Sequence, residues 1–244
     1  MKKRGRQFDI SWESLINDDL NALKDTPERF ARAATRTEHR LISALYANDV
    51  GTHTEGVGGN LYENGVNSTT AVLTIAELET GFEVMAELTD IGGEPIFNRP
   101  KFLVVPPALE MTARQILTST VKSWHYGSTS PTVVPQPTTN VIEQLGLVLV
   151  IDPYLPIVDT TNGDTGWYLF SDPNDIAAIG YAWLAGHEQP EIVMKASDKV
   201  SITGAPVGPF AGDFDTDNVF YRVRHVFGVA AQDWRATYAG GIVS

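Results

Sequence analysis

The sequence contains no cysteine among its 244 residues, which excludes disulfide bonds and thiolate metal sites and fits a reducing cytoplasm. It also lacks a long apolar run, because a segment such as Leu147–Ile151 is far shorter than the roughly 20 residues of a membrane-spanning helix. No apolar segment of a secretion signal follows the basic residues near the start. We therefore expect a cytoplasmic product without a membrane partner.

The motifs that usually carry catalysis or cofactor binding are missing as well. No two of the five histidines lie at the i, i+4 spacing of a helical metal pair, and no Gly-x-Ser-x-Gly turn occurs. The pair His187-Glu188 begins like a zinc-protease motif, but Pro190 would break the helix that such a motif requires. The glycines around Gly58 lack the Lys-Ser/Thr ending of a phosphate-binding loop. We therefore expect no metal, no cofactor and no enzymatic activity.

One acidic segment is similar to the opening of a calcium-binding loop, with aspartates at alternate positions, namely Asp213, Asp215 and Asp217. Asn218 occupies the position of the glycine that makes the sharp turn of such a loop, and Arg224 occupies the position of its bidentate glutamate. The segment is therefore better interpreted as a polar turn.

Charge is distributed unevenly along the chain, whose net charge is −12. Residues 1–40 hold nine of the 18 basic side chains and seven of the 30 acidic ones, a net charge of +2, so the other 204 residues carry −14. A basic segment on an acidic body fits binding to nucleic acid or to the acidic body of a neighbouring copy. A solvated surface is the alternative interpretation.

Three sets of charged residues are candidates for an interface between subunits. They are a basic cluster of Lys2, Lys3, Arg4 and Arg6, an arginine row of Arg29, Arg32, Arg36 and Arg40, and a glutamate row of Glu79, Glu83 and Glu87. Like charges three or four residues apart on a helix repel one another, so each row would be stabilised by a partner surface of opposite charge.

Hydrophobic periodicity predicts the first elements. Alternation over residues 5–13 predicts a half-exposed strand with nothing before it to pair with, so it would belong to a hairpin whose first half is missing or pair with another chain. A helix is predicted from residue 26 to about 47, with Pro27 in its first turn. Residues 48–70 lack a sustained period and indicate a long loop. Residues 74–77 form a capping box, which opens a second helix.

Short apolar segments separated by turns follow residue 101. Buried strands are predicted at 102–105 and 145–151, a helix at 108–118, a linker or surface loop at 127–140, and further strands at 166–170, 179–184, 191–196 and 219–229. Helices are predicted between residues 26 and 118 and mainly strands after them, which is typical of an α+β fold. Pro106 and Pro107 fix the turn between the first buried strand and its helix, and that turn holds neither a glycine nor a nucleophile. We expect a rigid corner there and no active site.

Four segments resemble parts of one protein family, in the family's own order. They are GRQFDISWESLINDDLNALKDTPERFARAATRTE at residues 5–38, FLVVPPALEMTARQIL at 102–117, GWYLFSDP at 166–173 and VFYRVRHVFGVAAQDWRATYAG at 219–240. The family is that of the major head subunits of Mu-like tailed phages and prophages. The similarity covers nearly the whole chain.

This resemblance implies the Hong Kong 97-type capsid fold, with a peripheral domain of a long spine helix and β strands, an axial domain and an extended loop. Residues 1–20 would be part of the extended loop and N-terminal region, 21–101 the peripheral domain with its spine helix at 26–47, 102–178 the axial domain, and 179–244 the return to the peripheral domain. The N-terminal arm and the outgoing half of the loop lack a counterpart, so the chain would be truncated or processed. Residues 1–20 and 48–70 would move during maturation.

The function that the resemblance implies is structural. The chain would assemble with itself, as pentamers and hexamers, into the icosahedral shell of a phage head that encloses double-stranded DNA without sequence-specific binding. It would reside in the virion capsid after assembly in the host cytoplasm. Portal, scaffold or prohead-protease, and decoration proteins would be its partners.

Three other functions stay open. The same fold could form the shell of a cargo-loaded protein compartment, and a small α+β enzyme could draw a carboxylate pair from the 30 acidic residues. The third is a nucleic-acid-binding protein that uses the basic N-terminal segment, although the charge of −14 on the remaining residues disfavours it.

Overall fold

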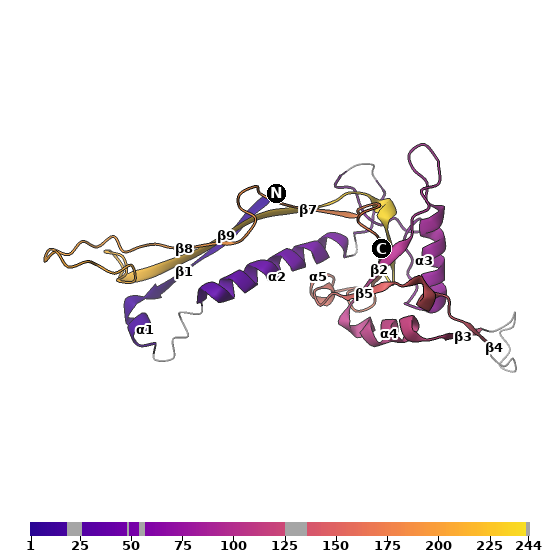
Figure 1. Ribbon diagram of the computed structural model, residues 1–244, viewed down its shortest axis with the longest axis horizontal. Helices are drawn as coiled ribbons and strands as arrows, with labels where there is room; N and C mark the ends of the chain where they lie inside the picture. The colour runs from indigo at the N-terminus through magenta and orange to yellow at the C-terminus, as the bar shows by residue number, and fades with distance from the viewer. Residues whose placement is uncertain (19–25, 48, 54–56, 125–135, 243–244) are drawn as a thin grey trace. The chain divides into compact units, whose positions relative to one another are not determined.

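The computed structural model describes residues 1–18, 26–47, 49–53, 57–124 and 136–242 of the chain (Figure 1). The chain divides into two compact units, each made of separate stretches of sequence. Unit 1 comprises Met1–His39 and Tyr181–Val229, and unit 2 comprises Arg40–Gly180 and Ala230–Ser244. Residues of both units occur in α2 (Thr26–Tyr46), β7 (Ile179–Trp183) and β9 (Asn218–Ala231).

Unit 1 is built on a long antiparallel ladder. β1 (Lys2–Ser11) pairs with β9 along its ten residues, from Lys2 opposite Phe227 to Ser11 opposite Asn218. β8 (Glu191–Met194) pairs with the opposite edge of β9. The order of the other three strands in this sheet is β1-β9-β7. The N-terminal strand therefore has a partner in its own chain, and the expectation that it would need a missing hairpin half or another chain as its partner was wrong. Local periodicity gave no sign of this pairing because the partner strand lies near the other end of the sequence.

The N-terminal strand also ends earlier than its alternation predicts, because a short helix begins. The Ser11 hydroxyl accepts a hydrogen bond from the Ser14 backbone N–H at 3.3 Å and caps α1 (Trp12–Ile16). A serine at this position satisfies one of the backbone donors that a helix start leaves unpaired. Trp12 and Glu13, predicted as the end of the strand, therefore belong to the helix.

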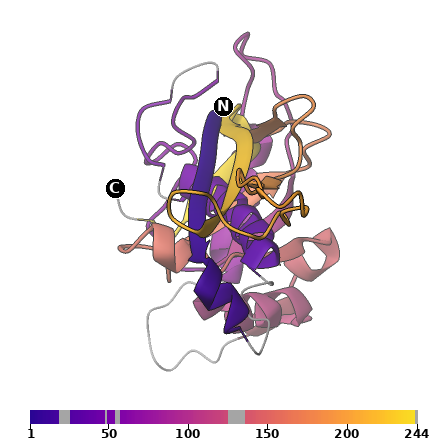
Figure 2. The ribbon, with the colours of Figure 1, turned by 90° about the vertical axis from the view of Figure 1, so that its left-hand side faces the viewer.

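The first part of α2 packs on one face of the β1–β9 ladder. Phe30 of α2 meets Phe8 of β1 edge to face, with ring centroids 6.0 Å apart. Both rings lie against a small core of Ile10, Val219 and Tyr221. Figure 2 shows β1 and β9 side by side in this unit. The predicted helix from residue 26 is confirmed and ends at Tyr46.

The core of unit 2 is a mixed sheet of four strands in the order β10-β6-β2-β5. Their bounds are β2 (Pro100–Val105), β5 (Val148–Ile151), β6 (Trp167–Ser171) and β10 (Thr237–Gly240). β5 runs parallel to β2, whereas β6 runs antiparallel to β2 and to β10. Successive side chains of a strand point to opposite faces. Accordingly, Leu103 and Val105 belong to one buried cluster and Val104 to the other.

Two helices cover the face of this sheet on which Leu103 and Val105 lie. They are α3 (Ile75–Glu87) and α4 (Glu110–Thr118). Their buried side chains pack into the same cluster as Leu103 and Val105, namely those of Leu78, Met85, Ala113 and Ile116. The predicted cap at Thr74 is confirmed, since its hydroxyl accepts a hydrogen bond from the Glu77 backbone N–H at 3.2 Å. The start of the third predicted helix is a 3-10 turn, η1 (Pro107–Leu109), which follows the proline corner.

The remaining short elements lie around this core. They are the β3 (Val121–Trp124) and β4 (Gln136–Thr139) hairpin strands, η2 (Ile142–Leu145), α5 (Leu155–Val158) and η3 (Trp234–Ala236). Most of the predicted linker at 127–140 lies outside the described residues, and its last part forms β4.

The prediction of a buried strand at 145–151 was wrong in two respects, because β5 starts later, at Val148, and is partly exposed. Residues up to Leu145 form η2, and Gly146 reverses the chain with a φ of 67°. β5 is the edge strand of the sheet, so Val148 and Val150 remain 45% and 40% exposed. An apolar run does not reveal whether a strand has one neighbour or two, which is why the sequence suggested full burial.

The long loop at 48–70 is better packed than its composition suggested, although residues 48 and 54–56 lie outside the described part. Tyr62 and Asn67 have no exposed surface. The Asn67 amide donates hydrogen bonds to the carbonyls of Leu61, Trp234 and Thr237 at 2.9, 3.2 and 3.0 Å. Its carbonyl oxygen accepts one from the Glu63 N–H at 2.9 Å. The described residues of this segment form a loop, as predicted, and Leu61 and Tyr62 pack into a buried cluster of unit 2.

Candidate subunit interface

The basic cluster near the N-terminus lies along β1 of unit 1. Because side chains alternate along a strand, Lys2, Arg4 and Arg6 point to one face of the ladder and Lys3 to the other. Lys2, Lys3 and Arg6 are exposed, whereas Arg4 is half-buried with its guanidinium 5.7 Å from the centre of the Phe227 ring. The structure therefore divides this predicted cluster between two surfaces.

The arginine row lies along α2, and all four of its side chains are exposed. Arg29, Arg32 and Arg36 belong to unit 1, and Arg40 belongs to unit 2. Arg32 pairs with Glu28 one helical turn earlier at 2.8 Å, with both side chains about two-thirds exposed at 68% and 66%. An ion pair that exposed contributes only about 0.5 kcal/mol to stability.

The glutamate row lies along α3 in unit 2. Glu79 forms an ion pair with Lys122 of β3, so one member of the row has a basic partner within its own unit. Leu78 and Met85, on the other side of the helix, are buried in the sheet cluster. The docking of either row on a neighbouring copy stays a prediction.

Sequence reasoning missed a group of exposed apolar residues in the segment between β8 and β9 of unit 1. Val200, Ile202 and Phe214 are 89%, 102% and 78% exposed. The segment has no regular period and is rich in glycine, proline and aspartate, so its apolar residues did not stand out. These exposed apolar side chains make the segment a candidate for contacts with other molecules.

Polar contacts brace this apolar segment at its base. Lys199 forms an ion pair with Asp217 and donates to the Ala211 carbonyl at 2.9 Å. The Phe214 N–H donates to the Asp198 carboxylate at 2.8 Å. The exposed side chains are thus presented by a backbone that is already ordered, which lowers the entropy cost of burying them against a partner.

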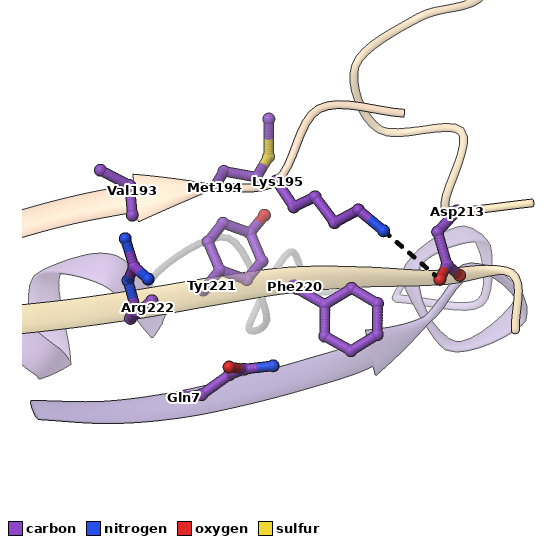
Figure 3. Close-up of a pocket in the computed structure, with 8 residues that line it drawn as sticks. All are labelled: Gln7, Val193, Met194, Lys195, Asp213, Phe220, Tyr221 and Arg222. Carbon is purple, nitrogen blue, oxygen red and sulfur yellow. Dashed lines mark ion pairs between the residues drawn. The ribbon is translucent and has the colours of Figure 1, made fainter. Parts of the chain in front are cut away.

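A hollow of roughly 430 Å³ lies at the foot of the same segment, over the β1–β9 ladder (Figure 3). Figure 3 shows the Lys195 side chain extended past Phe220 toward Asp213. The Lys195 ammonium lies 3.7 Å from Asp213 and 3.5 Å from Asp198. Lys195 thus links the two carboxylates and braces the turn.

The polar turn predicted at the alternating aspartates is confirmed. The Asp213 carboxylate accepts hydrogen bonds from the Thr216 hydroxyl at 2.6 Å and from the Thr216 and Asn218 N–H groups at 3.1 and 3.2 Å. The Thr216 hydroxyl, followed by these backbone donors, holds the pKa of Asp213 below its usual range. Within the described ranges, no group of three or more histidine, aspartate or glutamate side chains is placed to hold a metal ion.

The comparison with known protein families supports one of the open functions. A model of the family described as "Phage capsid protein" matches residues 1–240. The chain belongs to this phage capsid protein family. No curated protein matches the sequence. Among the described helices, none is long and apolar enough to cross a membrane.

Solved structures share the fold of this phage capsid protein. A structure from Mycobacterium phage Patience has 14% identity and a TM-score of 0.53, with 98% of this chain and 70% of that chain covered. The capsid of Myoviridae phage XM1 has 12% identity and a TM-score of 0.53 over 98% of this chain and 72% of that chain. The capsid structure of cyanophage P-SCSP1u has 12% identity and a TM-score of 0.51, with 98% of this chain and 71% of that chain covered.

Family and fold together give this chain a structural role as a capsid shell protein with a location in the phage particle. The mixed α+β class predicted from the sequence is confirmed. The compartment and enzyme alternatives gain no support. The narrower resemblance to Mu-like phages and the Hong Kong 97-type label stay predictions.

Proposed function

We propose that this capsid protein is the major subunit of an icosahedral phage head, in which pentamers and hexamers of the chain enclose double-stranded DNA. The observation that carries the proposal is the match of the phage capsid family to residues 1–240. A shell subunit needs no catalytic centre. It needs several self-complementary surfaces, because a closed assembly multiplies modest contacts into a stable whole.

The proposal includes the Hong Kong 97-type division of the chain. In it, residues 1–20 contribute to the extended loop, 21–101 and 179–244 form the peripheral domain with the spine helix, and 102–178 form the axial domain. The length of α2, at 21 residues, supports its assignment as the spine helix. The boundaries between the two compact units fall at other positions, namely 39/40, 180/181 and 229/230. A compact unit is a part of the chain that packs together, whereas the proposed domains are parts with one role in a shell.

Four surfaces are proposed to meet neighbouring copies. The arginine row and the exposed basic residues of β1 would face acidic surface such as the glutamate row, and the apolar segment with Ile202 and Phe214 would be buried against a neighbour. Charge complementarity mainly guides register and rate of association, whereas burial of the apolar side chains supplies most of the affinity. Salt would therefore weaken assembly without abolishing it.

The charge of the chain fits a wall around packaged DNA. Its net charge is −12, so the wall as a whole repels the phosphate backbone. A strongly basic inner wall would bind the backbone tightly and impede the movement of DNA into and out of the head. The shell would thus enclose DNA without reading its sequence. Assembly in the host cytoplasm with portal, scaffold or prohead-protease, and decoration proteins is part of the same proposal.

Particles isolated from the cells that produce this chain test the proposal. They should contain this chain as their most abundant protein and a double-stranded DNA that resists added nuclease until the particles are opened. Particles that hold a protein cargo and no protected DNA would contradict the proposal and favour the compartment alternative.

A further inference from the structure

A groove of about 540 Å³ runs between α2 and the β1–β9 ladder in unit 1. Small residues keep it open, since Gly5 lies on the strand side and Ala33 and Ala34 lie on the helix side. A Cβ on Gly5 would lie 2.6 Å from the Val223 carbonyl oxygen, so this position cannot carry a side chain without a shift of backbone. Phe30 and Phe227 give the groove an apolar lining.

Arg4 and His225, which both line this groove, each have one buried polar atom without a hydrogen-bond partner among the described residues. Arg4 and His225 are opposite one another in the β1–β9 register. Both Arg4 Nε and His225 Nδ1 are buried and have no hydrogen-bond partner among the described residues. His225 is only 4% exposed. A buried polar atom without a partner destabilises a folded protein, so two such atoms on residues opposite one another in the ladder point to a ligand that supplies the missing bonds.

The charged groups around the groove favour an anion. Glu38 of α2 contacts the other ring nitrogen of His225, Nε2, and also accepts from Tyr181 of β7. Burial, followed by the proximity of Glu38, raises the pKa of Tyr181 to about 12, so the phenol stays a donor. Glu38 is thus engaged by His225 and Tyr181, while Arg4 and Arg6 line the groove as cations.

We propose that this groove binds an extended acidic segment of a second copy of the chain. A carboxylate of that segment would accept hydrogen bonds from Arg4 Nε–H and from the Nδ1–H of His225. Apolar side chains of the segment would pack on Phe30 and Phe227. The inference rests on the proposed function, which supplies neighbouring copies, and identifies one contact that holds them together.

Two observations select a protein segment of this chain over the DNA backbone. The groove is lined by aromatic and alanine side chains as well as cations, whereas sites for a phosphate backbone are polar throughout and carry several exposed cations. The residues after position 40 also carry a net charge of −14, so other copies provide acidic segments in excess. Charge and apolar surface are thus complementary between copies.

The absence of cysteine allows a direct test with one introduced thiol. A34C places a thiol in the groove, and T35C places one on an exposed part of the same helix. The rate of maleimide alkylation is measured in dilute subunits and in assembled particles. We expect A34C to react at least about tenfold more slowly in particles, and T35C to be slowed less. Equal rates for A34C in closed particles and free subunits would overturn the inference and leave the shell function intact.

A matched pair of charge variants tests the role of Arg4. R4M removes the cation that lines the groove, and K2M removes an exposed cation from the same strand outside it. Sedimentation should show that R4M needs about tenfold more protein to associate, which corresponds to about 1.4 kcal/mol, and that K2M changes association less than threefold. Thermal unfolding followed by circular dichroism confirms that both variants fold. Equal effects of R4M and K2M would overturn the inference.

The remaining outcomes separate this inference from the proposed function. If R4M loses binding to a labelled 30-base-pair duplex while association and A34C protection are unchanged, the groove serves DNA and the inference is wrong. Small oligomers with a protected A34C would support the groove and contradict the shell. A chain that never associates would contradict both.

Discussion

The Tyr46 hydroxyl donates a hydrogen bond to the Asp152 carboxylate and so ties the end of α2 to the residue that follows β5 in unit 2. The same carboxylate oxygen accepts from the Ser43 hydroxyl at 2.5 Å, and the other oxygen accepts from the Tyr154 N–H at 2.8 Å. Tyr46 is only 5% exposed. Burial and the negative charge of Asp152 hold the pKa of Tyr46 far above its usual value, so the phenol remains a donor at all physiological pH values.

Removal of the Tyr46 hydroxyl should therefore destabilise unit 2. Y46F leaves the ring in place against Tyr168 and Phe170 but takes one donor from a partly buried carboxylate. We expect a loss of about 1–3 kcal/mol in the free energy of unfolding, measured by denaturant titration. Y154F is the control, because the structure gives the Tyr154 hydroxyl no hydrogen bond to a described residue. A loss for Y46F no larger than that for Y154F would contradict this account of the bond.

His53 should make the stability of unit 2 sensitive to mild acid. Its side chain is 8% exposed and its ring stacks on that of Trp234 at 3.9 Å between centroids. Burial lowers the pKa of His53 below 6.5, and Glu63 opposes this shift only in part. The unfolded chain then binds the proton more readily than the folded one, so stability is lost as pH falls below about 6.5.

The measurement for His53 is the thermal midpoint at pH 7.5 and at pH 5.5. We expect the wild type to lose stability over this interval and H53Q to lose less, because glutamine does not titrate. H187Q serves as the control, since His187 is half exposed at 50%. A pH dependence that H53Q leaves unchanged would show that other groups carry it.

Much of the fold could be predicted from local sequence, and the exceptions share a cause. The helix at α2 and the cap at Thr74 depend on neighbouring residues only, and both were predicted correctly. The partner of β1 and the exposure of β5 depend on strands distant in sequence, and neither was predicted. Local periodicity records which residues avoid water, and it does not record which strands become neighbours.

The candidate interface shows the same division. The arginine row was visible from helical spacing, because charges three and four residues apart share one side of a helix. The groove of Arg4 and His225 required the β1–β9 register, which only the folded chain provides. The exposed side chains of Ile202 and Phe214 lie in a segment without a period, so no pattern marked them.

Reversal of charge on the arginine row should weaken assembly. R32E/R36E replaces two exposed cations with anions on an already acidic protein, so neighbouring copies should associate more slowly and less tightly. Light scattering at about 0.1 M salt should show a delay and a rise of about tenfold or more in the protein concentration required. R32K/R36K, which keeps the charge, should assemble like the wild type. Assembly that is indifferent to both the reversal and the salt concentration would remove this row from the interface.

Loss of an exposed apolar side chain should weaken assembly without affecting the fold. Phe214 is 78% exposed, so F214S should leave the thermal midpoint of the free subunit nearly unchanged. If a neighbour buries this ring, the substitution should cost about 2 kcal/mol per contact and raise the assembly concentration more than tenfold. A205S, at an exposed position of the same segment, is the control. Unchanged assembly of F214S would place this segment outside the subunit contacts.

The central claim is that this chain forms a closed shell, and electron microscopy of the purified protein together with its light-scattering mass tests it most directly. The account predicts closed particles of uniform diameter, or rings of five and six subunits, with a mass that is a whole multiple of the 26.6 kDa chain. A monomer that persists over the whole range of protein concentration and salt would contradict it.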